Sequence, residues 1–379
     1  MKKRHLLAPG PTQVLPEALL AMARPIIYHR GPEYEAILAR VREGLKFLFQ
    51  TRNEVLVFTS SGTGGMEGAV VNTLSPGDRA LVIRGGKFGE RWGEICEAYG
   101  IHTEYIDVEW GRAVDPDLVA AALKADPSIK AVFATHSESS TGVLHDIGAI
   151  ARSVRATPAI LIVDAITSIG VVDLPMDAWG VDVVVSGSQK SLMIPPGLAF
   201  CGVSDKAWAV VERSRLPKFY FDFKAERKSL EKNQNAFTPA VSLIVALHES
   251  LAAIRAEGLQ AIFARHDRLA RATRAGVNAL GLELFAERPT PALTAVTVPS
   301  GVEASAIIKT LRTAHGITIA GGQTKVKGKI FRLAHLGYAD DSDVIVCLSA
   351  LERTLNDLGY PTKLGEGVRA AQEVLSQAG

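Results

Sequence analysis

Short apolar runs recur along the first half of the chain, separated by longer stretches with helical periodicity. Most of these runs span four or five residues without polar alternation, as is typical of strands buried on both faces of a parallel sheet. We expect strands at Val55–Phe58, Ala80–Ile83, His102–Ile106, Ala131–Ala134, Ile160–Val163, Val181–Val185 and Ala199–Val203. Helical segments between them predict an α/β fold with a mostly parallel seven-stranded sheet flanked by helices.

The pattern changes after the last of these strands. Residues 217–239 are polar and charged, which favours an exposed connection, and a long helical stretch follows from Val241 to about Leu280. Two more strands, at Ala295–Val298 and Ile330–Leu333, and an amphipathic segment, Ser342–Leu358, then predict a smaller α+β domain.

The length of 379 residues suits two domains rather than a single core. We expect a large domain at 21–255, which contains the motifs described below, and a small C-terminal domain at 256–379. Residues 1–20 form an N-terminal segment that we expect to pack with the small domain or with a partner subunit.

Composition excludes several classes of function. The formal net charge is only +2, so no basic field indicates a nucleic-acid partner, and no apolar run is long enough to predict a membrane span. Three widely spaced cysteines, Cys96, Cys201 and Cys347, fit no metal or redox motif and are expected to be reduced core residues. With an opening too short for a signal peptide, this predicts a cytoplasmic protein without a metal site.

A lysine follows the sixth predicted strand in the sequence DVVVSGSQKSLMIPPG. Lys190 sits in a small-polar turn between apolar segments, where burial can remove its proton and make it a nucleophile toward an aldehyde. The alternative is a solvated lysine in an ordinary turn. The residues around it favour a lysine that forms a Schiff base.

An aspartate ends the fifth predicted strand in the sequence AILIVDAITSIG. A buried carboxylate such as Asp164 needs a cation, and a protonated pyridine nitrogen is one. Alone, Asp164 could instead cap a helix or pair with a basic side chain. Together with Lys190 it indicates pyridoxal 5′-phosphate.

A phosphate site is predicted where VLVFTSSGTGGMEGAVVNTL passes from strand to helix. The backbone N–H groups of Ser61, Gly62 and Thr63 would lie at a helix N-terminus, which attracts a phosphate dianion. The glycine-rich turn is a weak signal alone. It matches neither the dinucleotide-binding nor the Walker pattern, which makes a dinucleotide or nucleoside triphosphate less favoured.

These pieces, in this order, resemble the class V aminotransferases of fold type I, in particular the alanine–glyoxylate, serine–pyruvate and serine–glyoxylate group. The resemblance covers almost the whole chain, and its most specific parts are THSESSTGVLHDI, LIVDAITSIG and SGSQKSLMIPPG. It implies pyridoxal phosphate, with Lys190 as the Schiff-base lysine and Asp164 as the partner of the pyridine nitrogen.

The resemblance also implies roles for further residues. Gln189 would join Ser61, Gly62 and Thr63 at the phosphate, and Ser139 would contact the region of the pyridine hydroxyl. Phe88 stands where several relatives stack a tryptophan on the cofactor. Thr238 would reach the phosphate of a partner subunit in a homodimer. Four further residues are left without a firm role. Asn235 stands near the place where many relatives carry a tyrosine, and Tyr28, His29 and Arg30 form a cluster near the expected entrance of a neighbouring subunit's active site.

Arg332 in KIFRLAHLGY is the expected substrate-binding residue, because a guanidinium offers two parallel donors to a carboxylate. Strand alternation places Ile330, Arg332 and Ala334 on one face, with Phe331 and Leu333 directed into a core on the other. The alternative is an arginine paired with a neighbouring acid.

The function implied is a ping-pong transamination from a small amino acid, alanine or serine, to a small 2-oxo acid, glyoxylate or pyruvate. Ureidoglycine is an alternative donor used by close relatives. A lyase or cysteine desulfurase of the same fold is a second alternative, although it needs a mobile cysteine. A non-catalytic binding protein is disfavoured by the presence of Lys190, Asp164 and Arg332 together.

Overall fold

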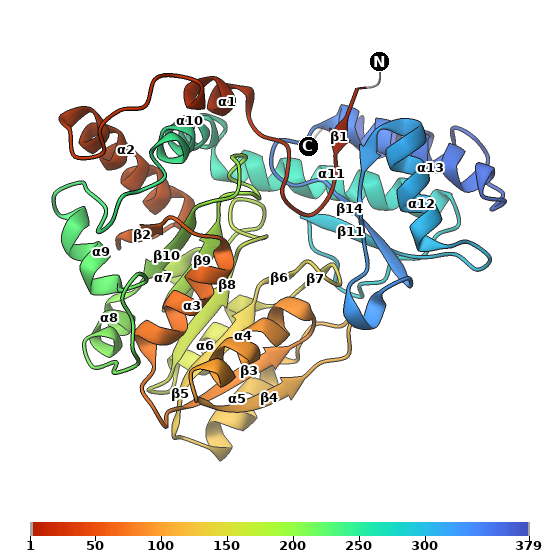
Figure 1. Cartoon of the computed structure of the whole chain (residues 1–379). Helices are drawn as coiled ribbons and strands as arrows, with labels where there is room; N and C mark the ends of the chain where they lie inside the picture. The colour runs from red at the N-terminus through yellow and green to blue at the C-terminus, as the bar shows by residue number, and fades with distance from the viewer. Residues whose placement is uncertain (1–2, 378–379) are drawn as a thin grey trace.

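A twisted sheet forms the centre of the larger part of the computed structural model, which describes residues 3–377 (Figure 1). The outermost residues of the two terminal ranges predicted above, 1–2 and 378–379, lie outside the described residues. The sheet has seven strands in the order β2-β10-β9-β8-β5-β3-β4, and only β10 runs antiparallel to its neighbours. The predicted mostly parallel seven-stranded sheet is therefore confirmed.

The strands of this sheet lie close to their predicted positions. Their bounds are β2 Val55–Phe58, β3 Arg79–Arg84, β4 His102–Asp107, β5 Ile129–Thr135, β8 Ile160–Asp164, β9 Val183–Gly187 and β10 Ala199–Val203. Every residue of β2, β8, β9 and β10 is buried, which explains their unbroken apolar sequences. The sequence analysis placed the start of β9 at Val181, two residues before its observed start at Val183. Asp182 lies just before the strand, where its side chain accepts a hydrogen bond from the Leu161 N–H.

Helices flank the sheet and connect its strands (Figure 1). They are α1 Pro16–Met22, α2 Pro32–Phe49, α3 Gly62–Thr73, α4 Lys87–Ala98, α5 Pro116–Ala125, α6 Ile147–Arg155, α7 Met176–Trp179, α8 Asp205–Val211 and α9 Phe223–Leu230. A short hairpin of β6 Ser137–Glu138 and β7 Val143–Leu144 follows β5 at the carboxyl edge of the sheet. That edge is where an open α/β sheet binds its ligands.

The smaller part of the molecule contains a three-stranded antiparallel sheet in the order β11-β14-β13. Its strands are β11 Leu293–Thr297, β13 Ala320–Gly321 and β14 Ile330–Ala334, and its helical segments are α11 Leu259–Ala279, α12 Ala304–Thr310, η1 Leu311–His315, η2 Thr324–Val326, α13 Asp341–Asp357 and α14 Glu366–Leu375. Phe331 and Leu333 enter the main core of this part, while Ile330 and Ala334 pack in a separate cluster, as alternation predicts.

The N-terminal segment joins the two parts. Strand β1, His5–Leu6, pairs in parallel with β12, Ile317–Thr318, of the smaller part, and Leu7 belongs to the smaller part's core. The segment then crosses to the large sheet, where the Thr12 N–H donates to the Gln189 carbonyl at 3.1 Å. It therefore lies between both parts, beside the turn that carries Lys190.

Two sequence-based expectations need correction. The long helical stretch consists of α10, Val241–Glu257, and α11, which are separated at Gly258 with a φ of +83°, a conformation that favours glycine. The polar connection at 217–239 is only partly exposed: α9 lies within it, and Phe223, Glu226 and Asn235 are buried.

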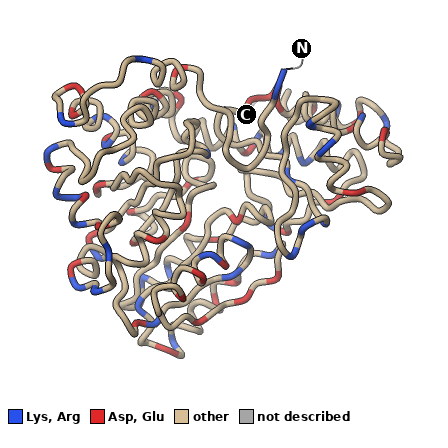
Figure 2. Tube along the Cα trace, viewed as in Figure 1, with Lys and Arg blue, Asp and Glu red and all other residues tan. Residues whose placement is uncertain are grey.

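Charged side chains of both signs are interspersed over the helices and loops (Figure 2). Asp164, Lys190 and Arg332 are exceptions, because each is buried near the junction of the two parts. No helix among the described residues is long and apolar enough to cross a membrane.

Candidate active site

Lys190 lies in the turn after β9, at the carboxyl edge of the sheet, and only 9% of it is exposed. Its Nζ donates a hydrogen bond to the Pro9 carbonyl, and its own carbonyl accepts one from Thr12 Oγ1 at 2.8 Å. Burial lowers the pKa of the amine to about 8, with a smaller lowering by Arg332 and an opposing effect of Asp164. A substantial fraction of this amine is therefore neutral and nucleophilic near physiological pH.

Asp164 is the last residue of β8 and is 4% exposed. Its Oδ1 accepts a hydrogen bond from the Ile166 N–H at 2.8 Å. Burial raises the pKa of the carboxyl to about 7; the Ile166 N–H opposes this rise and the nearby Glu138 adds to it. A protonated pyridine nitrogen would stabilise the ionised form, so the residue fits its predicted role.

The first turn of α3 supplies the predicted phosphate contacts. Ser61 is the N-cap residue, and its side chain does not cap the helix, so backbone N–H groups of this turn are free for an anion. A Cβ at Gly62 would lie 2.5 Å from Ile166 Cδ1, so glycine lets the Ile166 side chain pack closely against this turn. The Thr63 hydroxyl accepts a hydrogen bond from Arg91 Nη1 at 3.2 Å.

Gln189 reaches the same place from the turn after β9. A Cβ added to Gly187 would lie 3.3 Å from Gln189 Oε1 and 3.4 Å from Gly62 Cα, so the amide and the α3 terminus are neighbours. Gln189 Oε1 is buried without a hydrogen-bond partner among the described residues. We define Ser61, Gly62, Thr63 and Gln189 as the phosphate cup; its backbone N–H groups, its hydroxyls and the side-chain N–H group of Gln189 are the donors that a phosphate would need.

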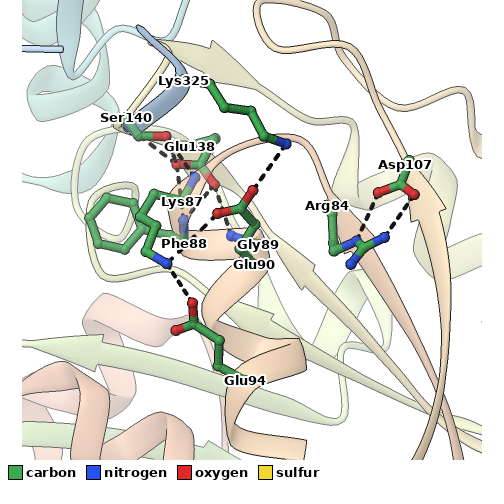
Figure 3. A network of polar contacts seen from close by, with 10 residues as sticks. All are labelled: Arg84, Lys87, Phe88, Gly89, Glu90, Glu94, Asp107, Glu138, Ser140 and Lys325. Carbon is green, nitrogen blue, oxygen red and sulfur yellow. Dashed lines mark hydrogen bonds and ion pairs between the residues drawn. The ribbon is translucent and has the colours of Figure 1, made fainter. Parts of the chain in front are cut away.

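Phe88 lies at the start of α4 and is half-buried, as a residue that packs on a cofactor ring requires. Its backbone is held by Glu138, which accepts hydrogen bonds from the Phe88 N–H at 3.1 Å and the Gly89 N–H at 2.9 Å (Figure 3). The other Glu138 oxygen accepts from Ser140 Oγ at 2.5 Å. This buried carboxylate therefore ties α4 to the turn after β6.

Arg332 connects the two parts of the molecule. From β14 of the smaller part, its Nη1 donates to the Ser139 carbonyl at 2.7 Å, next to Glu138. Its Nε and Nη2 both donate to the Gly321 carbonyl, at 3.0 and 2.7 Å. Burial lowers the pKa of the guanidinium to about 10, and Glu138 opposes this change. A substrate carboxylate would supply the anion that these neutral carbonyls do not.

The structure thus gathers most of the predicted residues around the carboxyl edge of the sheet. They are Ser61, Gly62, Thr63, Phe88, Ser139, Asp164, Gln189, Lys190 and Arg332. The set combines a nucleophilic amine, a buried carboxylate, a phosphate cup and a guanidinium. These groups fit pyridoxal phosphate and a carboxylate substrate.

Other residues singled out in the sequence lie elsewhere on this chain. Thr238 is exposed and lines a depression with Thr59 and Tyr220, before α10. Asn235 is buried: its Oδ1 accepts from Tyr34 Oη at 2.5 Å and its Nδ2 donates to Glu226 at 2.7 Å. It therefore forms its hydrogen bonds in the interior of this chain. Tyr28 is 69% exposed and contacts His29 edge to face, and Arg30 donates to Gln234.

Four residues at the site had no role in the sequence analysis: Pro9, Thr12, Arg91 and Glu138. Pro9 and Thr12 belong to the segment APGPTQVLP near the start of the chain, and their contacts with Lys190 join segments about 180 residues apart. Glu138 lies within HSESSTG, where an acid between small residues was a signal for a buried, hydrogen-bonded carboxylate.

The three cysteines are free and buried, as expected, in α4, β10 and α13. Burial raises the pKa of the Cys96 and Cys347 thiols to about 12 and raises that of Cys201 as well. Across residues 3–377, no group of three or more His, Cys, Asp or Glu side chains is arranged to hold a metal ion.

Comparison with known proteins gives a consistent result. Residues 13–337 match the family model described as aminotransferase class-V. The chain is 50% identical to the "soluble hydrogenase, small subunit" of a Synechococcus strain, with 99% of each chain covered. It is 42% identical to the L-aspartate–glyoxylate aminotransferase of Paracoccus denitrificans, with 97% of this chain and 95% of that protein covered. It is 40% identical to the serine–glyoxylate aminotransferase of Hyphomicrobium methylovorum, with 98% and 95% covered.

Solved structures show the same fold over the full length. The ureidoglycine–glyoxylate aminotransferase of Bacillus subtilis superposes with a TM-score of 0.94 at 30% identity, covering 100% of this chain and 99% of that one. The pyridoxamine–pyruvate aminotransferase of Mesorhizobium loti gives a TM-score of 0.95 at 31% identity, covering 99% and 97%.

Proposed function

Because the chain belongs to the class V aminotransferases, we propose that it moves the amino group of a small amino acid to a small 2-oxo acid, using Lys190 as its central residue. It is a pyridoxal-phosphate-dependent transaminase of fold type I. The observation that carries the proposal is the Lys190 amine. It is buried near Asp164 and Arg332, and burial lowers its pKa to about 8.

Pyridoxal phosphate, when bound, supplies an aldehyde for the amine and a ring that withdraws electrons from the substrate's α-carbon. Asp164 would keep the ring nitrogen protonated, and the phosphate cup and Phe88 would fix the position of the ring. The Lys190 amine would hold the cofactor at its aldehyde carbon and, once free, would move a proton to or from the substrate's α-carbon as general base and acid.

Arg332 binds the carboxylate that amino donor and oxo-acid acceptor have in common. Two parallel N–H donors fix the orientation of that carboxylate and hence of the α-carbon beside Lys190. Its present bonds to Ser139 and Gly321 come from both parts of the molecule, so its position depends on how the two parts meet.

We propose alanine or serine as donor and glyoxylate or pyruvate as acceptor. The names of three relatives pair glyoxylate with aspartate, serine or ureidoglycine. Glyoxylate is common to all three, so the names support this acceptor more strongly than they support any one donor. Ureidoglycine is the alternative donor. A desulfurase is disfavoured, because Cys96, Cys201 and Cys347 are all buried and none lies in a loop.

We further propose a cytoplasmic homodimer with shared active sites. Free thiols at all three cysteines support a reducing compartment. An aromatic group adjoins Thr238: Tyr220 stacks on Phe237, and Phe219 is 80% exposed. An exposed apolar patch of this kind supports a contact with a second subunit at this face. Through this face Thr238 would reach the partner's phosphate cup.

A panel of amino donors tests the proposed reaction. Alanine, serine, aspartate and ureidoglycine are each paired with glyoxylate and with pyruvate, and the oxo-acid products are measured. We expect kcat/KM to be highest for alanine or serine with glyoxylate or pyruvate. Highest turnover with ureidoglycine would select the alternative donor, and release of sulfide from cysteine without transamination would overturn the proposal.

A further inference from the structure

Arg91 on α4 is a half-buried cation that the roles above do not use. Its cationic neighbours in the chain have acidic partners, since Arg84 pairs with Asp107 at 2.7 Å and Lys87 pairs with Glu94. Arg91 forms no ion pair with any carboxylate of the described residues. Its hydrogen bond goes instead to the uncharged hydroxyl of Thr63.

In the contact between Arg91 and Thr63, the arginine is the donor and the hydroxyl is the acceptor. Thr63 Oγ1 accepts from Arg91 Nη1 at 3.2 Å, so the hydroxyl proton of Thr63 is free to point elsewhere in the phosphate cup. The Arg91 guanidinium also lies over the Phe88 ring, with its carbon 4.9 Å from the ring centre. Arg91 thus bridges the cup and the aromatic residue expected to face the cofactor ring.

The phosphate cup has no charged side chain of its own. Ser61, Gly62, Thr63 and Gln189 are all uncharged, whereas a phosphate monoester carries about two negative charges near neutral pH. The N-terminus of α3 contributes a positive partial charge of only about one half. A guanidinium next to Thr63 therefore meets an electrostatic need that the cup leaves open.

The field of Arg91 also reaches the centre of the site. It lowers the pKa of both Lys190 and Asp164, although other influences on each group are larger. A cation beside the cup thus acts on the same groups that hold the cofactor's aldehyde and ring nitrogen.

We propose that Arg91 is a further cofactor-binding residue, which donates hydrogen bonds to the phosphate beside the Thr63 hydroxyl and supplies the positive charge that the cup lacks. The proposal rests on the proposed function through the assignment of the cup. The alternative is that Arg91 only supports Phe88 through a cation–π contact.

Pyridoxal and pyridoxal phosphate separate the two roles, because both carry the ring and the aldehyde and only one carries the phosphate. Their dissociation constants are measured by visible absorbance on the full-length apoprotein of wild type, Arg91→Gln, Arg91→Lys and Lys87→Gln. Lys87→Gln is the matched control, since it removes one charge from the same helix at a side chain directed toward Glu94 (Figure 3). Thermal unfolding of each apoprotein checks that the variants are folded.

We expect Arg91→Gln to weaken binding of pyridoxal phosphate about ten- to hundred-fold, the range for a hydrogen bond to a charged group, and to leave pyridoxal within about twofold. Arg91→Lys should recover part of the loss, and Lys87→Gln should match wild type. Inorganic phosphate should compete less well with the cofactor in Arg91→Gln.

Two results would overturn the proposal. An equal loss of affinity for both ligands in Arg91→Gln would assign Arg91 to the ring, through Phe88, and unchanged affinity for pyridoxal phosphate would remove it from cofactor binding. Failure of the cup assignment is distinguishable from both, because wild type itself would then bind pyridoxal and pyridoxal phosphate equally well.

Discussion

Lys190 shows how burial and chain topology tune a single residue. The strand before it, the small turn and the N-terminal segment with Pro9 and Thr12 together remove its side chain from water. Desolvation disfavours the ammonium form, and nearby Arg332 adds to this effect, while Asp164 opposes it. The sequence predicted burial from the apolar segments on both sides, whereas the contact with Pro9 depends on the tertiary fold.

The lowered pKa of Lys190 predicts the pH dependence of cofactor incorporation. Only the neutral amine attacks the aldehyde, so the rate for the apoprotein should rise with pH and level off above about 8, the pKa of Lys190. Stopped-flow absorbance measures this rate. Incorporation that keeps rising toward pH 10, as for an ordinary lysine, would contradict the assignment; Lys87→Gln is a control that should follow wild type.

Asp164→Asn tests the cost of the buried carboxyl in the apoprotein. The pKa of Asp164 is about 7 in the folded chain and about 3.9 in an unfolded one, so its ionisation destabilises the fold as pH rises from about 4 through 7. At pH 8 the variant apoprotein should therefore unfold about 2 to 6 °C higher than wild type, and near pH 4 the difference should vanish. Transamination should nevertheless be lost. Calorimetry showing a lower unfolding temperature at pH 8 would refute this explanation.

At the scale of elements, Glu138 joins pieces that carry different parts of the site. One of its oxygens accepts from the first turn of α4, which positions Phe88, and the other accepts from Ser140 (Figure 3). The adjacent Ser139 carbonyl holds Arg332. A single buried carboxyl group therefore links Phe88, proposed to face the cofactor, to Arg332, proposed to bind the substrate.

Glu138→Gln should weaken this junction. In the wild type one Glu138 oxygen also accepts a hydrogen bond from the Ser140 N–H at 3.2 Å. A glutamine has only one acceptor oxygen, so its NH₂ group would face an N–H donor on one side, and the free energy of unfolding should fall by about 1 to 3 kcal/mol. Urea unfolding of the apoprotein measures it. Glu94→Gln on the exposed face of α4 is the control and should change the stability by less than about 0.5 kcal/mol. A loss of stability below about 0.5 kcal/mol for Glu138→Gln would contradict the role of Glu138 in joining these elements.

Elements with strong patterns were predictable, and those shaped by tertiary contacts were not. Strands β2 and β10 match their predicted bounds, because buried strands need continuous apolar sequence. The break between α10 and α11 was missed, since the apolar periodicity continues through Gly258. Likewise, Glu226 and Asn235 looked exposed by composition, yet both are buried. They share one hydrogen bond, and Tyr34 and the Ala236 N–H supply the others that their burial needs.

At the scale of the whole molecule, the site is assembled from both sheets and the N-terminal segment. Lys190, Asp164 and the phosphate cup come from the edge of the large sheet, and Arg332 comes from the small one. The sequence predicted these groups individually from motifs. That Pro9 contacts Lys190, and that Arg332 meets Ser139 near Lys190, follows only from how distant segments pack.

Subunit complementation tests the proposed sharing of active sites. Lys190→Ala and Thr238→Asp should each be nearly inactive, the second because its carboxylate would repel the partner's phosphate. After co-refolding, a mixed dimer contains one intact site, so a statistical mixture should regain about a quarter of wild-type activity. Mixing Lys190→Ala with itself is the control. No recovery, in a mixture shown to contain mixed dimers, would contradict the contribution of Thr238 to its partner.

The visible spectrum of the purified protein tests the central claim, that Lys190 holds pyridoxal phosphate for transamination, most directly. The wild-type protein should be yellow; its visible band should disappear on adding alanine or serine and return on adding glyoxylate, because amino group and aldehyde exchange on the cofactor. Lys190→Ala should not show this cycle at a comparable rate. A wild-type band that is absent, or a cycle unchanged in Lys190→Ala, would contradict the claim.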